Sequence, residues 1–289
     1  MTIAAGERLI MTDARRPLSA DRWASRRGRA LAFLREHGIG GLVGSIRAAG
    51  AHGTAEFVVR HARYSVCIFL GKQWDRTHSV DTGGQIEIQS LDVVGPNADM
   101  GYPAVSTSPS TFAYFSQFFP QDRSQYSFVD LGCGKGRTLL LASKLGFRKV
   151  VGVEFAGSLC ETARTNIARF PMRKEHRDSC VVVHADATQF DLPNGNLVLY
   201  FGNPFGLELW PAMLANIAES LRQNPRHIRL VLAGSLGDAI SATGRLIAEH
   251  GLFNRIAQGA APFYLDTYRP FHYEVFEASG VSNSQGEQA

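Results

Sequence analysis

The sequence predicts an α/β fold: a doubly wound, mostly parallel sheet of seven strands with an N-terminal extension. Three observations lead to this prediction. From Tyr126 onward, short apolar runs alternate with longer runs of helical period. A glycine-rich turn joins the first of these strands to its helix, and polar or acidic residues follow the ends of the later strands. Strands that alternate with helices are typical of a parallel sheet covered on both faces.

The chain has 289 residues, enough for one large domain or for a domain of ~150 residues with an extension. Its 45% hydrophobic content is ordinary for a globular protein with a sizeable core. The composition along the chain predicts a flexible arm at 1–20, an N-terminal extension or lid at 21–110, the main domain at 111–279 and a disordered tail at 280–289.

No apolar run approaches about 18 residues, so the sequence predicts no membrane span, and no signal peptide is recognisable. The four cysteines are widely spaced, which predicts neither a metal site nor a disulfide framework. A cytoplasmic location is the resulting expectation.

The net charge of +4 is mild, and the densest basic patch is formed by Arg22, Arg26, Arg27 and Arg29. We interpret this patch as a solvated helix face. A nucleic-acid footprint is the alternative, but no interleaved aromatic residues support it. The oligomeric state stays open.

In the N-terminal part, the periodicity predicts a helix from Ser19 to Gly38. Residues 57–70 fit either a strand or a short helix. A turn at 81–84 precedes an exposed strand at 85–88, and Ser110 is the expected N-cap of a helix over 111–119.

The second half contains the alternating elements. We expect strands at 128–131, 149–153, 180–184, 197–201, 228–233, 252–256 and 272–278, and helices at 136–145, 158–170, 208–222 and 238–250. The last two strands are expected to pair like a hairpin.

The glycine turn reads Asp130-Leu131-Gly132-Cys133-Gly134-Lys135-Gly136. Glycine accepts backbone angles that side chains forbid, and it lets a ligand approach the main chain. A P-loop would need Ser or Thr after the lysine, and a dinucleotide fingerprint would need its third glycine one residue later. The turn therefore predicts a different polar ligand. We expect Cys133 to be a small filler of the turn and Lys135 to face solvent.

Ligands of open parallel sheets bind at the carboxyl ends of the strands. Glu154 ends the second strand about 20 residues after Gly132, the distance at which an acid accepts from the ribose hydroxyls of an adenosine ligand. Asp186 follows the third strand, and Asn203-Pro204-Phe205 follows the fourth. An Asx turn at Asp186 and an ordinary Asn-Pro turn are the structural alternatives for these two positions.

These motifs, in this order over residues 126–278, resemble the class I S-adenosylmethionine (SAM) dependent methyltransferases, whose sheet is Rossmann-like. The likeness is to an uncharacterised bacterial group with Asn-Pro-Phe after the fourth strand. The stretch from Tyr102 through Thr107-Ser108-Pro109 is also similar to the approach to motif I in DOT1-type lysine methyltransferases, where a loop covers the cofactor. Asn203-Pro204-Phe205 resembles the Asn-Pro-Pro-Tyr/Phe motif of amino-directed enzymes, shortened by one proline.

The resemblance implies SAM as cofactor and a methyl acceptor of unidentified class, either protein lysine, nucleobase or small molecule. It implies that Asp186 accepts from the adenine amino group. An amide oxygen and a main-chain carbonyl at Asn203-Pro204 would hold an amine toward the methyl group, and the ring of Phe205 would pack on it. The implied cofactor-binding residues are Asp130, Gly132, Cys133, Gly134, Gly136, Glu154, Phe155, Asp186, Ala187 and Asn203, and the implied catalytic residues are Asn203, Pro204 and Phe205.

Two other function classes remain open on the sequence. One is an NAD-dependent oxidoreductase with an unusual glycine loop. The other is a non-catalytic protein that binds SAM or nucleic acid. Ligand-induced thermal shifts separate SAM from NAD, and steep salt dependence would mark nucleic-acid binding.

Overall fold

The computed structural model describes residues 59, 62–63, 65–86, 104–203, 205–262, 265 and 270–278. The helix expected at 19–38 with its arginine patch, the arm at 1–20, the tail at 280–289 and Pro204 lie outside the described residues. Across the described part of the chain, no helix combines the length and the apolar character needed to cross a membrane.

A helix spans residues 65–78, and residues 59 and 62–63 are also helical, so the described part of 57–70 is helix rather than strand. Two short strands follow, β1 (Gln85–Ile86) and β2 (Ala104–Val105), which pair antiparallel. Helix α3 (Pro109–Phe115) starts two residues earlier than expected. Its N-cap is Ser108, whose hydroxyl accepts from the Thr111 N–H, so the prediction of Ser110 as the cap is wrong. Pro109 explains the shift, because a proline is favoured in the first helical turn.

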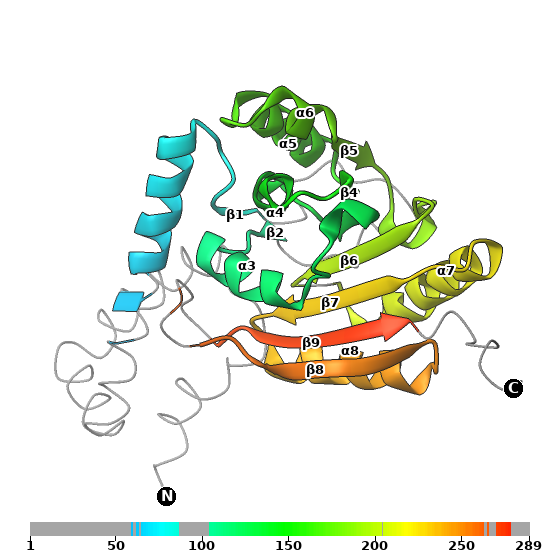
Figure 1. The fold of residues 1–289 in the computed structure, drawn as a ribbon. Coiled ribbons are helices and arrows are strands. Elements are labelled where there is room, and N and C mark those ends of the chain that lie inside the picture. Colours follow the sequence, from blue (N-terminus) through cyan, green and yellow to red (C-terminus); the bar gives the residue numbers. More distant parts are fainter. Residues whose placement is uncertain are drawn as a thin grey trace, which may run out of the picture.

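A seven-stranded sheet forms the centre of the molecule (Figure 1). Its strands are β3 (Tyr126–Leu131), β4 (Lys149–Glu154), β5 (Cys180–His184), β6 (Asn196–Gly202), β7 (Ile228–Gly234), β8 (Phe253–Ala260) and β9 (His272–Ala278). The spatial order is β5-β4-β3-β6-β7-β9-β8. The first five are parallel, and β9 runs antiparallel to both of its neighbours. The predicted mostly parallel sheet and the closing hairpin are confirmed.

Helices cover both faces of this sheet. They are α4 (Arg137–Ala142), α5 (Gly157–Arg169), α6 (Lys174–Asp178), α7 (Trp210–Gln223) and α8 (Gly237–Glu249). Helix α6 was not predicted, because its five polar residues have no apolar period. The side chains of α3, α4 and α5 pack with one face of the sheet, and those of α7 and α8 with the other. The doubly wound arrangement is therefore confirmed.

The winding reverses between β3 and β6, which are neighbours in the sheet although β4 and β5 lie between them in sequence. In β3, Phe128 packs into the cluster on the α4 face and Val129 into the cluster on the α7 face. Because successive strand residues point to opposite faces and helices cover both, residues 127–131 of this central strand are all buried. The carboxyl ends of β5, β4, β3 and β6 lie side by side, and these are the ends that carry the predicted site.

Candidate active site

The glycine turn after β3 needs its glycines for backbone reasons. Gly132, Gly134 and Gly136 have φ values of +100°, +53° and +81°, the left-handed region that side chains disfavour. A side chain at Gly132 would meet no atom within 4 Å, so the main chain there is open to a ligand, whereas at Gly136 it would lie 3.1 Å from Ala163 of α5. The turn thus combines an open approach with close packing against the helix after β4.

The N–H groups of the turn are largely occupied by the protein itself. Gly132 and Cys133 donate to the carbonyl oxygen of Val153 at 2.9 and 3.1 Å, and Gly136 donates to that of Cys133 at 2.9 Å. Gly134 donates to Glu154 Oε2 at 2.8 Å. The turn is therefore a rigid platform with few donors left for an anion.

Glu154 ends β4, and its carboxylate lies against the turn. Besides the Gly134 N–H it accepts from the Ala156 N–H at 3.1 Å, and it is only 4% exposed. Burial raises the pKa of Glu154, and the hydrogen bonds from the backbone oppose this rise. A third backbone hydrogen bond comes from Phe155. A carboxylate has about four lone-pair sites, so these three bonds still leave acceptor capacity for a ribose hydroxyl. The residue fits the expected role, which stays a prediction.

Asp130 lies at the carboxyl end of β3, and its carboxylate accepts a hydrogen bond from the Thr138 hydroxyl in α4. Its neighbours in the sheet are Gly152 and Tyr200. The side chain is buried, and this burial raises the pKa of Asp130 to about 7, which the Thr138 hydrogen bond partly counteracts. Asp130 therefore supports the start of α4 beneath the turn.

This buried carboxyl predicts a pH-dependent stability. Because the pKa of Asp130 rises from 3.8 to about 7 on folding, the folded chain holds an extra proton between about pH 4 and 7. The free energy of unfolding contributed by this group thus falls as the pH rises through that window. We expect Asp130→Asn to have a higher free energy of unfolding than the wild type. This difference should be about 2 kcal/mol larger at pH 8 than at pH 5.

Urea unfolding of the cofactor-free protein at both pH values measures this difference. Asp191→Asn, at an exposed position, is the control. An equal effect of Asp130→Asn at both pH values would contradict the prediction.

Cys133 is buried, and its Sγ lies 2.6 Å from where a side chain on Gly152 would begin. Burial, with the nearby carboxylates of Glu154 and Asp130, raises the pKa of the Cys133 thiol. The residue fills the space under the turn, as expected. Phe155 follows Glu154, and its carbonyl oxygen lies 3.1 Å from His184 Nε2.

Asp186 forms an Asx turn after β5. Its Oδ1 accepts from the Thr188 N–H at 2.9 Å and from the Thr188 hydroxyl at 2.7 Å, which caps the short 3₁₀ turn Ala187–Gln189. The structural alternative from the sequence is therefore present. Because Asp186 is only partly buried, a contact with adenine is compatible with this turn and stays a prediction.

Asn203 follows β6 and has φ +53°, one of two non-glycine residues with positive φ in the described chain. Its N–H donates to the carbonyl oxygen of Ala233 at 2.7 Å. Its Oδ1 accepts from the Ser235 N–H at 2.9 Å and lies 3.3 Å from the Ser235 hydroxyl. Since a backbone N–H must face an oxygen, this contact fixes the orientation of the amide. Its Nδ2 is buried and makes no hydrogen bond within the described structure.

This geometry differs from the expected one, in which the amide oxygen of Asn203 accepts from an amine. The oxygen already accepts a hydrogen bond from Ser235, a residue that the sequence did not point to. Ser235 is a polar residue directly after β7, the strand next to β6 in the sheet, and this position could have identified it. Phe205 also differs, because its ring packs on Phe201 and Trp210 at centroid distances of 6.1 and 5.5 Å. It therefore belongs at least in part to the core.

The N-terminal segment reaches this edge of the sheet in two places. Thr107 is buried, and its Oγ1 lies 3.0 Å from the hydroxyl of Tyr200 on β6. Lys135 does not face solvent as expected. Its Nζ donates to Asp81 Oδ1 at 2.9 Å and to the Gly83 carbonyl at 3.0 Å, and the side chain is 15% exposed. These contacts join residues more than 50 positions apart, so local sequence could not reveal them.

The strand ends thus bring the predicted residues to one edge of the sheet. Gly134 and Glu154 are in direct contact, Asp186 follows the strand beside Glu154, and Asn203 follows the strand beside Asp130. The described residues contain no group of three or more His, Cys, Asp or Glu side chains placed to hold a metal ion. The strand order β5-β4-β3-β6-β7-β9-β8, with a glycine turn after β3 and an acid at the end of β4, is the arrangement that the resemblance to class I SAM-dependent methyltransferases leads us to expect.

Comparison with known proteins agrees with this class. Residues 128–224 match a family model described as a methyltransferase domain. A stretch of 92 residues is 30% identical to the ribosomal protein L11 methyltransferase of Cellvibrio japonicus (strain Ueda107), covering 32% of this chain and 31% of that protein. The chain thus spans about a third of that relative's length. Over residues 128–224 the chain is therefore similar to methyltransferase domains, which supports the class I SAM-dependent type.

Among solved structures, the glycopeptide N-methyltransferase MtfA in complex with S-adenosylhomocysteine is 18% identical, with a TM-score of 0.47 over 66% of this chain and 100% of that one. The magnesium protoporphyrin IX methyltransferase of Synechocystis PCC 6803 is 15% identical, with a TM-score of 0.44 over 59% and 79% of the two chains.

Proposed function

We propose that this protein transfers a methyl group from SAM to a nitrogen of an acceptor molecule. The observation that carries the proposal is the Glu154 carboxylate, which lies on the Gly134 N–H at the centre of the glycine turn. A negative charge at this point suits an adenosine ligand that carries a positive sulfonium. When bound, SAM supplies the reaction with a methyl group on a positively charged sulfur.

The same observation disfavours an NAD-dependent oxidoreductase. A dinucleotide site presents free N–H groups of the glycine turn to the pyrophosphate. In this turn the N–H groups of Gly132, Cys133, Gly134 and Gly136 bond to protein oxygens.

The proposed roles follow the strand ends. Gly132, Gly134 and Gly136 let the methionine part of the cofactor approach the main chain, Glu154 accepts from the ribose, and Asp186 with Ala187 lies against the adenine. Asn203, Pro204 and Phe205 border the acceptor. The residues of this chain contribute mainly by orienting two bound reactants, for which effective molarities reach ~10⁵ M or more.

The preference for nitrogen rests on the likeness of Asn203-Pro204-Phe205 to amino-directed enzymes. Since Ser235 occupies the amide oxygen, we assign acceptance of the amine N–H to the main-chain carbonyl of Asn203. The Nδ2 of Asn203 is then available to donate to an oxygen elsewhere on the acceptor. We further propose that residues 21–110 form a lid-like extension of a methyltransferase domain at 111–279.

Two measurements test the function. Calorimetry should detect binding of SAM and not of NAD. A transfer assay with tritium-labelled SAM on fractionated cell extract should then place base-stable label, as expected for N-methyl groups, on protein, nucleic acid or small molecules. Binding of NAD without SAM would contradict the proposal, and base-labile label would exclude nitrogen as the acceptor atom.

A further inference from the structure

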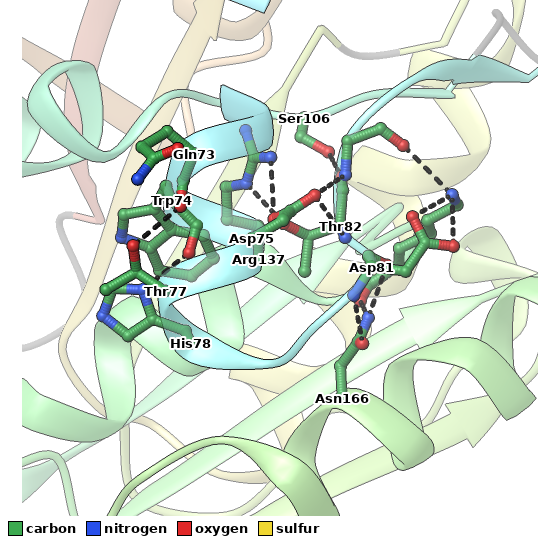
Figure 2. Close-up of polar contacts among 12 residues, drawn as sticks. Gln73, Trp74, Asp75, Thr77, His78, Asp81, Thr82, Ser106, Arg137 and Asn166 are labelled. Carbon is green, nitrogen blue, oxygen red and sulfur yellow. Dashed lines mark hydrogen bonds and ion pairs between the residues drawn. The ribbon is translucent and has the colours of Figure 1, made fainter. Parts of the chain in front are cut away.

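The turn after the 65–78 helix, residues 79–84, lies directly against the glycine turn. We call this segment the strap. Figure 2 shows its polar contacts, which run from the helix through Thr82 to Arg137, and from Asp81 to Asn166. None of these residues is among the site residues expected from the sequence, yet Arg137 directly follows Gly136.

Asp75 of the helix is the centre of the first group of contacts. It is 9% exposed, and its carboxylate accepts from the N–H groups of Thr82 and Gly83 at 3.0 and 2.8 Å. It also accepts from the Thr82 hydroxyl at 2.5 Å and from Arg137 Nη2 at 3.3 Å. The buried charge of Asp75 is thus paired and hydrogen-bonded, which such a charge requires.

Arg137 is the first residue of α4 and is 6% exposed. Its Nε donates to the Thr82 hydroxyl at 2.6 Å, and its guanidinium lies 5.4 Å from the ring centroid of Trp74. The Thr82 hydroxyl therefore accepts from Arg137 while it donates to Asp75. These hydrogen bonds connect the start of α4 with the strap. Lysine cannot reproduce them, because it lacks the planar guanidinium group with donors in fixed directions.

Asn166 of α5 forms the second group of contacts and is 1% exposed. Its amide pairs with both backbone groups of Asp81, accepting from the N–H at 2.8 Å and donating to the carbonyl at 2.7 Å. The Nδ2 also donates to the carbonyl of Lys135 at 2.9 Å. One side chain thus holds the strap and the glycine turn in a fixed register. The Lys135–Asp81 ion pair adds less, because Asp81 is 71% exposed.

Lys135 and Arg137 flank Gly136, and both are fastened to the strap. We propose that Arg137 and Asn166 are positioning residues that hold the glycine turn in its cofactor-binding shape, so that docking of the strap and binding of SAM are energetically linked. This inference rests on the proposed function. By reciprocity, SAM must stabilise the docked strap by the same factor by which the docked strap strengthens SAM binding.

Conservative variants test the proposal. Arg137→Lys keeps the charge but loses the Nε contact with Thr82, and Asn166→Ala removes the amide. Arg226→Lys and Asn196→Ala are the matched controls. Arg226 is a 5% exposed arginine bonded to the carbonyls of Ser220 and Asn224, and Asn196 accepts from the His227 N–H at the opposite edge of the sheet.

Calorimetry on the folded full-length variants should show SAM binding weakened by ~10-fold or more in Arg137→Lys and Asn166→Ala, and by less than ~2-fold in the controls. Hydrogen exchange supplies a second readout. SAM should slow exchange of the Thr82 and Gly83 amides in the wild type, and this protection should be lost in Arg137→Lys.

Equal SAM affinity in the four variants, or no SAM-dependent protection of the strap, would overturn the inference while the proposed function stands. A wild-type protein that binds no SAM would overturn both.

Discussion

Replacing Glu154 by alanine is expected to weaken SAM binding by about 100-fold or more. The reason is that the carboxylate has two roles, one toward the cofactor and one toward the glycine turn. It is the proposed acceptor for the ribose hydroxyls, and it holds the Gly134 and Ala156 N–H groups at 2.8 and 3.1 Å. Hydrogen bonds to a charged group contribute ~1.5–3 kcal/mol each, and a buried N–H left without a partner adds a further cost.

Isothermal titration calorimetry with SAM measures this loss. Glu161→Ala is the matched control, since Glu161 is a solvent-exposed glutamate on the helix after β4. Thermal unfolding should accompany the titration, so that a folded variant is assured. Unchanged SAM affinity in Glu154→Ala would remove the ribose role.

Replacing Asn203 by aspartate should leave SAM affinity within a few-fold and reduce methyl transfer by ~10²-fold or more. Aspartate tolerates the left-handed backbone of this position, and its oxygen can still accept from the Ser235 N–H. The substitution removes the Nδ2 donor and adds a negative charge where the acceptor is proposed to bind. The acceptor should therefore be oriented less well for transfer, while the residues proposed to bind the cofactor are unchanged.

Asn203→Gly provides the comparison, because glycine also accepts positive φ but supplies no side chain. Single-turnover transfer and calorimetry with SAM should be measured on both variants. If Asn203→Asp transfers methyl groups at the wild-type rate while Asn203→Gly unfolds more easily, the residue has a structural role in the turn and no role at the acceptor.

Most of the sheet could be predicted because its signals are local. Strands such as Phe128–Leu131 are short apolar runs, and the glycines at 132, 134 and 136 mark a turn with left-handed backbone. Helix α6 was not predicted, because a short polar helix has no apolar period. The cap was placed at Ser110 instead of Ser108, because two serines near Pro109 are both suitable cap residues. The site residues at strand ends could be located because parallel strands place their carboxyl ends at one edge.

The partners of these residues could not be predicted. Lys135 and Arg137 are hydrogen-bonded to a segment more than 50 positions earlier in the chain, and the Asn203 amide is oriented by Ser235, which directly follows the neighbouring strand β7. From the sequence, a lysine, arginine or asparagine side chain could form hydrogen bonds with many different residues. Only the folded chain selects one of them, through burial and the need to satisfy every buried polar group.

The sequence by itself thus determined the class of fold, the glycine turn and the strand ends at which a ligand would bind, because strand and helix periods and turn residues act over a few positions. The tertiary structure decided which atoms remain available there. It placed the Glu154 carboxylate on the Gly134 N–H, engaged the Asn203 oxygen and joined the strap to Arg137 and Asn166. The physical reason is that hydrogen-bond partners in a buried site are chosen by three-dimensional proximity, which local sequence does not encode.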